Sequence, residues 1–585
     1  MNVGKEIHMK NIFKRLFCIV LCLIISSSFF ACGFNESEET DDTTSTTADS
    51  ETENTVFALT AGNLKEYKII VPDKLMKDLS GAVEQLQNYI TVLTDTEPEV
   101  KSDFISEGSD IYCETEYEII IGNANRSEAA ELYKSVRNKD SGYALVDKKL
   151  LIFGDTEDLV KSSVKLFNKE VLSKADNAES VLLYSGENKL VQGAYNSQLK
   201  INGVNISEYT VVYPASPKLQ EKTIATELCK WIEVNAGYSI NCVSDTAEPS
   251  KYEISVGDTN RITDAMKAEN GSKLTSSDSY LASKHGDLLW VTGKTANAIS
   301  RAATALISSA DQSGEVGLDT PVSGEIKDLS ITVMSYNIRG MLDADKRDSE
   351  GVIDSIKQRD PDIFAAQEAV SQSGQAANWI SRLDAALGDK YDSVKGLFVG
   401  TYNSYLPVYY KKDKFELVSQ SSKYLTHTPD KRSQLEGSEY FRTVTFVVLR
   451  DKQTGIEFLY SNNHFDTAGY IVRTEEAKIL AQMLGDYPLI PQIVGGDFNT
   501  DSSTTPIQTL TSKTELTVGE KIAETAILGG SGAGDYITRG ETAIDMVLVT
   551  SQSISVQKYE IWDNKIDGRY PSDHLPIWLE MTVSY

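Results

Sequence analysis

The sequence is poor in cysteine, in histidine and in basic residues. The low cysteine and basic content argues against disulfide-rich, cysteine-ligated metal and polyanion-binding proteins. Six cysteines among 585 residues are too sparse for a disulfide framework or a cysteine-ligated metal knuckle. Lys and Arg number 57 against 85 Asp and Glu, a formal net charge of -28. This balance argues against a surface that holds a polyanion by counterion release. The length itself predicts several domains rather than one core.

The N-terminus has the pattern of an export signal. An apolar run of 15 residues covers 16–30, which is too short to span a bilayer comfortably but suits a signal peptide. Basic residues precede this run, at Lys10, Lys14 and Arg15. The run ends in Ala-Cys-Gly, which resembles a bacterial lipobox, and we therefore predict a lipoprotein signal peptide over residues 1–32 with Cys32 as the lipidation site. The expected location is the extracytoplasmic face of a bacterial cell membrane, where the lipid anchor makes the membrane a partner. Ordinary cleavage nearby, giving a secreted protein, is the alternative.

An acidic segment follows the leader. Residues 33–56 are rich in Ser and Thr, and the stretch from Asn35 to Thr55 holds eight acidic residues and no basic one. Such a segment cannot bury enough apolar surface to fold, so we predict a solvated linker. Of the cysteines that remain beyond the leader, Cys229 and Cys242 are able to pair in an oxidising compartment.

Residues 57–327 contain one pattern twice, with a period near 140 residues. EYKIIVP at 66–72 returns as EYTVVYP at 208–214, and YEIIIGNANR at 117–126 returns as YEISVGDTNR at 252–261. Short β-branched runs alternate with helical stretches such as 79–93 and 222–234, which predicts an α/β unit at 57–190 and another at 191–327. A period of this length indicates a duplicated domain and not a solenoid.

Each α/β unit resembles the small domain that precedes the catalytic barrel in bacterial hexosaminidases and glucuronidases. The resemblance rests on the strand-Pro-helix opening, on the Gly after the second strand and on the late L-x-x-x-G strand. It implies an accessory role, as a spacer or docking module, with surface glycan contact as the alternative. A glycosidase is excluded, because the chain has no room for a barrel of about 250 residues beside its C-terminal domain.

From Ser330 onward, apolar strands alternate with polar, chemistry-bearing groups. In chain order these groups are Asn337, then Gln367 and Glu368, then Asn463, His464 and Asp466, then Asp497 and Asn499, then Asp545, and finally Asp573 and His574. Strand ends that meet at one edge of a sheet gather such groups into a single cleft. One motif alone is explained as a turn or loop, but six in order within one domain are not. Two of the chain's five histidines fall in these motifs.

This ordered motif set is identified as that of the endonuclease/exonuclease/phosphatase superfamily, the DNase I-like metal-dependent phosphohydrolases. The predicted domain covers residues 328–585. The resemblance implies a DNase I-like four-layer α/β sandwich, so the whole chain is expected to be an α/β multidomain protein with tandem small α/β domains before the sandwich.

The chemistry of phosphodiester hydrolysis explains why these residue types are needed. The substrate is an anion that repels nucleophiles, so hydrolysis requires charge neutralisation, an aligned water and a stabilised leaving oxygen. Mg²⁺ prefers carboxylate and amide oxygens, and it is the expected cofactor, with Mn²⁺ or Ca²⁺ as alternatives. The resemblance implies three metal ligands, namely Asn337, Glu368 and Asp573.

The remaining site residues are assigned to proton transfer and phosphate contact. His574 acts as general base or as the positive group over the phosphate, and Asp545 fixes its tautomer. Asp497 and Asn499 orient the attacking water, and His464 donates to a phosphoryl oxygen. Arg442, Tyr405 and Asn403 are weaker candidates for substrate binding, because each also has a purely structural explanation. Arg442 could instead pair with Glu439, and a turn would explain Tyr405 and Asn403.

We therefore predict an extracytoplasmic, lipid-anchored, metal-dependent phosphohydrolase that cleaves phosphodiester bonds by in-line attack of water. Residues 330–585 have 25 Lys and Arg against 35 Asp and Glu, and no cationic cluster interleaved with aromatics marks a duplex-binding face. No stable nucleic-acid partner is expected, and the partner is a phosphate ester that the sequence does not identify. A secreted DNase I-like endonuclease is the second hypothesis. A cell-surface glycan-binding protein with an inactive hydrolase domain is the third.

Overall fold

The computed structural model describes residues 56–105, 114–195, 197–340, 347–370, 379–399, 405–532 and 542–585. The predicted signal peptide with Cys32, the linker before Val56 and the candidate Asn403 lie outside the described residues. The chain divides into two compact units: one extends to Ser197 and includes Asn235–Ser239, and the other comprises Gln198–Val234 and Ile240–Tyr585. No described helix is both long enough and apolar enough to cross a membrane.

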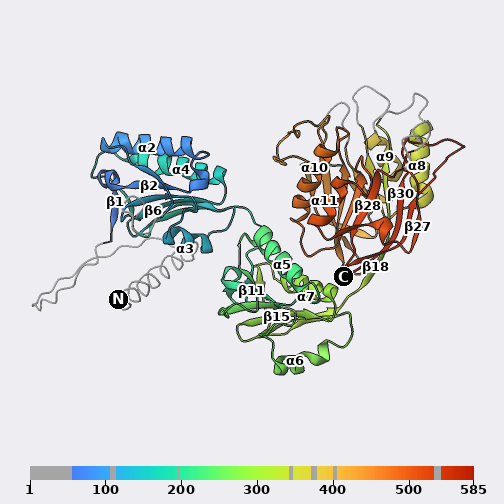
Figure 1. Cartoon of the computed structure of the whole chain (residues 1–585), viewed down its shortest axis with the longest axis horizontal. Helices are drawn as coiled ribbons and strands as arrows, with labels where there is room; N and C mark the ends of the chain where they lie inside the picture. Colours follow the sequence, from blue (N-terminus) through green and yellow to red (C-terminus); the bar gives the residue numbers. More distant parts are fainter. Residues whose placement is uncertain are drawn as a thin grey trace, which may run out of the picture. The chain divides into compact units, whose positions relative to one another are not determined.

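The first unit (blue in Figure 1) is a six-stranded sheet with helices on both faces. Across the sheet the strands are β3 (Val100–Ser102), β2 (Lys68–Val71), β4 (Glu118–Ile121), β6 (Lys149–Gly154), β5 (Ser141–Val146) and β8 (Asn188–Val191). The helices are α2 (Ser80–Thr94), α3 (Ser127–Ser135) and α4 (Glu157–Glu170), and a separate two-stranded sheet pairs β1 (Ala58–Thr60) with β7 (Val181–Tyr184). Because both sheet faces are covered, β4 is a continuous apolar run after its first residue.

The second unit (green to red in Figure 1) begins with a sheet of the same design. Its strands, in order, are β12 (Cys242–Ser244), β11 (Tyr209–Tyr213), β13 (Tyr252–Val256), β15 (Leu288–Gly293), β14 (Ser279–His285) and β17 (Val322–Glu325). The helices are α5 (Glu221–Ala236), α6 (Asp264–Asn270) and α7 (Ala296–Ser308), and a small sheet joins β10 (Val204–Asn205), β9 (Lys200–Ile201) and β16 (Glu315–Val316).

The two six-stranded sheets agree in strand order and in strand direction. In each, the first four strands run parallel and the last two pair antiparallel. Both helices expected from the sequence are present, as α2 and α5. This agreement is the arrangement that a duplication would give, while the boundaries at 190/191 and 327/328 stay predictions. Cys229 and Cys242 are free thiols.

The C-terminal part contains two larger sheets. The first, in order, has β20 (Tyr391–Val394), β21 (Val408–Lys411), β19 (Ile363–Gln367), β18 (Asp328–Asn337), β30 (Ile577–Ser584), β29 (Ile554–Ile561) and β27 (Thr525–Ile527). The second has β22 (Phe415–Tyr424), β23 (Thr443–Asp451), β24 (Glu457–His464), β25 (Gln492–Asp497), β28 (Asp545–Thr550) and β26 (Leu516–Val518). Four helices complete this part: α8 (Arg347–Arg359), α9 (Trp379–Leu387), α10 (Tyr470–Leu484) and α11 (Thr505–Lys513).

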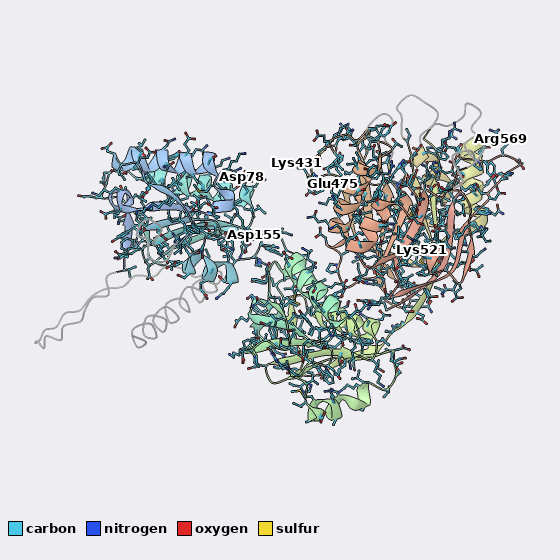
Figure 2. All side chains as sticks on the ribbon, in the orientation of Figure 1. Asp78, Asp155, Lys431, Glu475, Lys521 and Arg569 are labelled. Carbon is cyan, nitrogen blue, oxygen red and sulfur yellow. The ribbon has the colours of Figure 1, made fainter. Side chains whose placement is uncertain are left out.

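The alternation of side chains along these strands builds four layers. In β18, Ile331 and Val333 join a core cluster shared by both sheets, whereas Met334 and Tyr336 point the other way, into a cluster with α8 and α9. Helices α10 and α11 cover the outer face of the second sheet in the same way. The predicted four-layer α/β sandwich is thus confirmed. Exposed charged side chains, such as Lys521 here and Asp155 in the first unit, lie on the outer surfaces (Figure 2).

Candidate active site

The strand register places the predicted site residues at one edge of the sandwich. In the first sheet, Asn337 at the end of β18 pairs with Gln367 at the end of β19. In the second sheet, His464 pairs with Asp497, and Asp497 pairs with Asp545. β28 is antiparallel to β25, so its first residue lies beside the last residue of β25. A hydrogen bond of 3.0 Å from Asn337 Nδ2 to Asp497 Oδ2 joins the two sheets.

A buried amide pair also links the sheets behind this edge. Gln367 Nε2 donates to Asn462 Oδ1 at 2.7 Å. Asn462 Nδ2 in turn donates to the carbonyls of Ala366 (2.8 Å) and Pro407 (3.0 Å). These bonds hold β19 against β24, so that the ends of both strands keep their spacing. Asn462 is not among the predicted residues, although it stands next to Asn463 in the polar end of β24.

Sharp turns follow three of the strands. Arg339, Glu368 and Asn499 have left-handed backbones, with φ of 59°, 60° and 51°. Such a conformation costs a non-glycine residue of order 1–3 kcal/mol, and it persists where the surroundings demand it. At Glu368 the turn leaves the carboxylate in the site, where Oε1 accepts from Asn337 Nδ2 at 3.2 Å and Oε2 accepts from the Gly340 amide at 2.8 Å.

His574 and Asp545 form a hydrogen-bonded pair. Nδ1 of His574 lies 2.8 Å from Asp545 Oδ2. Nε2 therefore faces the site, 3.5 Å from Asn337 Nδ2 and 3.9 Å from Asp497 Oδ2. Burial lowers the pKa of His574, but the carboxylates of Asp545, Asp497 and Asp573 outweigh it and raise that pKa to about 10. The acid in the apolar strand β28 thus orients the ring and favours its cationic form.

Two serines outside the predicted set hold this pair in place. Ser572 Oγ donates to the Asn337 carbonyl at 2.7 Å and accepts from the His574 amide at 3.3 Å. Ser531 Oγ accepts from the Asp545 amide at 3.3 Å. Ser572 stands next to the Asp-His motif, which is a signal that could have identified it. Ser531 lies in a Gly-rich loop, and no sequence pattern marks it.

Asp497 is a fully buried carboxylate, 1% exposed. Its Oδ1 accepts from the Asn499 amide at 2.8 Å, and its Oδ2 accepts from Asn337. Burial, together with repulsion from Asp545, raises the pKa of Asp497 to about 7. The preceding Gly496 has φ 152°, and a Cβ there would collide with a backbone carbonyl of β24, so the Gly-Gly step is a packing requirement.

His464 lies on the other side of Asp497. Its Nε2 is 3.5 Å from Asp497 Oδ2. Burial lowers the pKa of His464 well below its usual value, and the positive charges of Arg442 and His574 add to this effect. His464 is therefore neutral, and its contact with Asp497 is not an ion pair. Asn499 Nδ2 donates to the carbonyl of Phe465 at 2.8 Å, which ties the two turns together.

Glu368 offers the strongest fit to a divalent cation among the predicted ligands. Its carboxylate is aimed by the strained turn and held by two donors, and oxygen ligands suit Mg²⁺. Asn337 presents its amide nitrogen to Glu368, while its Oδ1 accepts from the Arg339 amide at 3.1 Å. A rotation of the amide would turn the oxygen toward the carboxylate. The Asp573 side chain contacts Ser572 Oγ at 3.4 Å, and its charge acts on His574.

A second group of potential ligands lies close by. Atoms of Asp497, Asp545 and His574 lie within 4.8 Å of one another. In this group, however, the Nδ1 of His574 is engaged by Asp545, so the histidine would have to give up its orienting bond to ligate a metal. Glu368 has no bond to a histidine to give up, because its carboxylate oxygens accept only from Asn337 Nδ2 and the Gly340 amide among the described residues.

Of the weaker substrate-binding candidates, Arg442 lies near enough to His464 for its charge to lower the pKa of that histidine. Arg442 pairs with Asp466, with 3.5 Å between Nε and Oδ2, and stacks on Tyr440 at 4.9 Å. Glu439, the alternative partner considered from the sequence, is thus not the ion-pair partner of Arg442 in the described structure. The backbone amides of Glu439 and Tyr440 instead donate to Asp466. Asp466 therefore organises the loop that carries Arg442.

Tyr405 lies beside the Glu368 turn. Its amide donates to the carbonyl of Ala369 at 3.2 Å, and Ala369 directly follows Glu368. The Tyr405 ring lies 5.2 Å from that of Phe398. This position next to the site agrees with a substrate contact, which stays a prediction.

The C-terminal part of the chain is similar to proteins of known family. Residues 334–574 match the sequence model of the Endonuclease/Exonuclease/phosphatase family. No curated protein sequence matches the chain.

Similar solved structures each cover less than half of this chain. One is a crystal structure of an endonuclease/exonuclease/phosphatase family protein from Bacteroides thetaiotaomicron, with 25% identity over 44% of this chain and 99% of that chain and a TM-score of 0.39. Another is a mannosyl-6-phosphatase of the same organism, with 24% identity, 43% and 99% coverage and a TM-score of 0.38. A third is the catalytic domain of human Nocturnin with bound sulfate, with 18% identity, 44% and 97% coverage and a TM-score of 0.34. By its sequence match over residues 334–574, the C-terminal part of this chain is similar to the Endonuclease/Exonuclease/phosphatase family.

Proposed function

We propose that the C-terminal domain hydrolyses phosphoester bonds, phosphodiesters in the first place, with Mg²⁺ as its cofactor. The observation that carries this proposal is the His574–Asp545 pair, whose free ring nitrogen faces the buried Asp497 carboxylate and the Asn337 amide. An oriented imidazole and a carboxylate around one point are the groups that water attack on phosphorus needs. The family match to residues 334–574 supports the same reaction class.

The cation would be held by Glu368, with the Asn337 amide turned over and Asp573 as further oxygen donors. When bound, it would neutralise the phosphoryl oxygens and the charge that develops on the leaving oxygen. Mn²⁺ and Ca²⁺ have the same preference for oxygen and remain the alternatives.

The chain's own residues supply the remaining functions. Asp497 Oδ2, held by Asn337, accepts a hydrogen bond from the attacking water and receives its proton, while Asn499 fixes the other carboxylate oxygen. His574 Nε2 donates to a phosphoryl oxygen, because Asp545 holds the opposite side of the ring and stabilises its positive charge. His464, neutral and adjacent, provides a second donor. The water oxygen bonds to phosphorus as the ester oxygen departs, so the net reaction adds water across one P–O bond.

Small phosphoesters suit the charge of the domain better than nucleic acid. From Ser330 onward, 25 basic residues are outnumbered by 35 acidic ones, and a polyanion would gain little from counterion release on such a surface. A small ester needs only the local cation and the donors of the site.

We also propose that the protein is held on the extracytoplasmic face of a bacterial membrane through lipid on Cys32. The basic n-region, the short apolar run and the Ala-Cys-Gly ending support this location. Replacement of Cys32 by Ser should release the protein from the membrane fraction. Retention of the Cys32→Ser variant in that fraction would argue against a lipid anchor.

The proposed activity is tested with the purified full chain and a panel of esters. A bis-aryl phosphate, an inositol phosphate, sphingomyelin and plasmid DNA are each incubated with Mg²⁺ and then with EDTA. We expect hydrolysis of at least one small phosphodiester in Mg²⁺ and none in EDTA. Equal rates in Mg²⁺ and EDTA would contradict the proposed cofactor, and no hydrolysis by a folded chain would contradict the proposed reaction class.

A further inference from the structure

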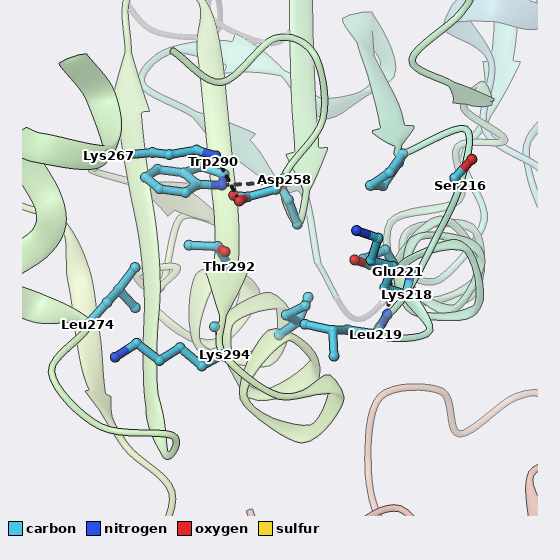
Figure 3. Close-up of a pocket in the computed structure, with 14 residues that line it drawn as sticks. Ser216, Lys218, Leu219, Glu221, Asp258, Lys267, Leu274, Trp290, Thr292 and Lys294 are labelled. Carbon is cyan, nitrogen blue, oxygen red and sulfur yellow. Dashed lines mark hydrogen bonds and ion pairs between the residues drawn. The ribbon is translucent and has the colours of Figure 1, made fainter. Parts of the chain in front are cut away.

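The second α/β repeat contains a cavity of about 570 Å³ (Figure 3). It lies where the parallel strands β11, β13 and β15 end and where α5 and α7 begin, and it is lined there by Pro214, Gly257 and Gly293. In open α/β sheets, ligands bind outside the carboxyl ends of the strands. The volume is in the range of small-molecule sites.

The rim of this cavity is cationic. Lys218, Lys267 and Lys294 line it together with two acids, Glu221 and Asp258. Asp258 Oδ2 is paired with Lys267 at 2.8 Å. Throughout the described part of the chain, the ammonium groups of Lys218 and Lys294 have no ion-pair partner. Two unpaired lysines at one cavity, in a chain with a net charge of -28, indicate a place for an anion.

Glu221 does not neutralise these lysines, because it has a structural task. Its Oε2 accepts from the backbone amides of Lys218 (2.8 Å) and Leu219 (2.7 Å). The carboxylate thereby fixes the loop that carries Lys218 to the first turn of α5. Gly257 (φ 76°) lies against Glu221, and a Cβ at that glycine would come within 2.6 Å of Glu221 Cγ, so the loop and the strand end are closely packed.

The floor of the cavity holds an unpartnered polar side chain. Thr292 lines the cavity and is 4% exposed, and among the described residues its hydroxyl has no hydrogen-bond partner. The hydroxyl is not among the buried side-chain atoms that lack a partner, so it is reached from the cavity and is available to a bound molecule. Beside it, Trp290 is 2% exposed and donates its indole N–H to the Gly257 carbonyl at 3.0 Å, which makes the wall rigid.

We propose that this cavity binds a small hydroxylated anion, a monosaccharide unit that carries a phosphate or a carboxylate group. Lys218 and Lys294 take the oxyanion. Thr292 and the carboxylate of Asp258 hydrogen-bond the hydroxyls, and Leu219 and the rest of the apolar lining face the ring. The start of α7, directly after Lys294, adds backbone amides on the same side. This binding function is separate from phosphoester hydrolysis and does not depend on it.

The first repeat provides an internal contrast. Counted from the matching Pro72 and Pro214, Lys218 corresponds to Met76, and counted from the matching Gly154 and Gly293, Lys294 corresponds to Asp155. The first repeat therefore lacks both cations, and it has an acid where the second has a lysine. The proposed site belongs to the second repeat alone.

Isothermal titration calorimetry on the full chain in EDTA tests the proposal. The probes are glucose 6-phosphate, glucuronate and glucose. We expect both anions to bind at one site per chain and glucose to bind at least tenfold more weakly. The double variant Lys218→Ala/Lys294→Ala should weaken anion binding at least tenfold, whereas Lys284→Ala, which removes an exposed lysine on β14 of the same repeat, should leave it unchanged.

The catalytic domain is distinguished by its own variant. Because EDTA is present and the site lies in the second repeat, His574→Ala should bind both anions as the unchanged chain does. The double lysine variant should in turn keep the phosphoester hydrolysis of the unchanged chain. Undiminished anion binding by the double variant, equal binding of glucose, or the absence of binding by both anions would each overturn the proposal.

Discussion

The replacement Asp545→Asn tests how the site controls its histidine. Asp545 is 1% exposed and its Oδ2 lies 2.8 Å from His574 Nδ1, so it holds the ring that faces the substrate. Its charge also raises the pKa of Asp497. A hydrogen bond to a charged group contributes about 1.5–3 kcal/mol. Each 1.36 kcal/mol in the activation free energy is a factor of ten in rate. We therefore expect kcat to fall about 10- to 150-fold with little change in KM.

The assay is the hydrolysis of a bis-aryl phosphate by the full chain in Mg²⁺, with kcat and KM measured from pH 5 to 10. Asn has the shape of Asp but lacks its charge, so the pKa of His574 should fall and the pH profile should shift with it. Circular dichroism and the thermal midpoint serve as folding controls. A kcat within threefold of the unchanged chain, from a folded variant, would refute the role assigned to Asp545.

Three further predictions concern stability and the metal. Burial raises the pKa of Glu476 to about 8, so above about pH 4.5 the folded state holds a proton that the unfolded state has released. The free energy of unfolding should therefore fall as the pH rises from 4.5 through 8. Urea unfolding of the Glu476→Gln variant should not show this pH dependence. Gly496→Ala puts a Cβ against the Asn463 carbonyl at φ 152°, and its thermal midpoint should reveal a loss of roughly 1–3 kcal/mol or more; an unchanged midpoint would contradict the packing argument. Glu368→Gln should abolish both the Mg²⁺-dependent hydrolysis and any rise in thermal midpoint on addition of Mg²⁺, whereas a retained response to Mg²⁺ would place the cation elsewhere.

The C-terminal fold was predictable from the sequence for a physical reason. Strands such as β19 and β25 are largely apolar and end in polar groups, at Gln367 and Asp497, so the edge of the sheets is visible in the sequence. Asp545 was recognisable because an acid inside an apolar strand needs a partner. That partner is His574, 2.8 Å away. The roles assigned to these residues in catalysis stay predictions.

Other features depend on contacts between segments distant in the chain. The bond between Gln367 and Asn462 joins two sheets, and no local pattern indicates which buried amides will meet. Ser531 accepts a hydrogen bond from the backbone amide of Asp545. Any loop residue with a hydroxyl could make this bond, so the sequence does not mark Ser531. The cavity of the second repeat arises because three strand ends and two helix starts converge there. Its lysines are far apart in the sequence, where they look like ordinary surface charges.

The most direct test of the central claim compares two histidine variants of one domain. His574→Ala removes the imidazole of the site. His427→Ala removes a histidine whose side chain is 70% exposed and which contacts none of the site residues in the described structure. The measurement is kcat/KM for Mg²⁺-dependent phosphodiester hydrolysis by the full chain. We predict a loss of about 10²- to 10³-fold for His574→Ala, as expected when a donor to the charge that develops on the phosphoryl oxygen is removed, and no change for His427→Ala. Equal activity of the two variants would contradict the account.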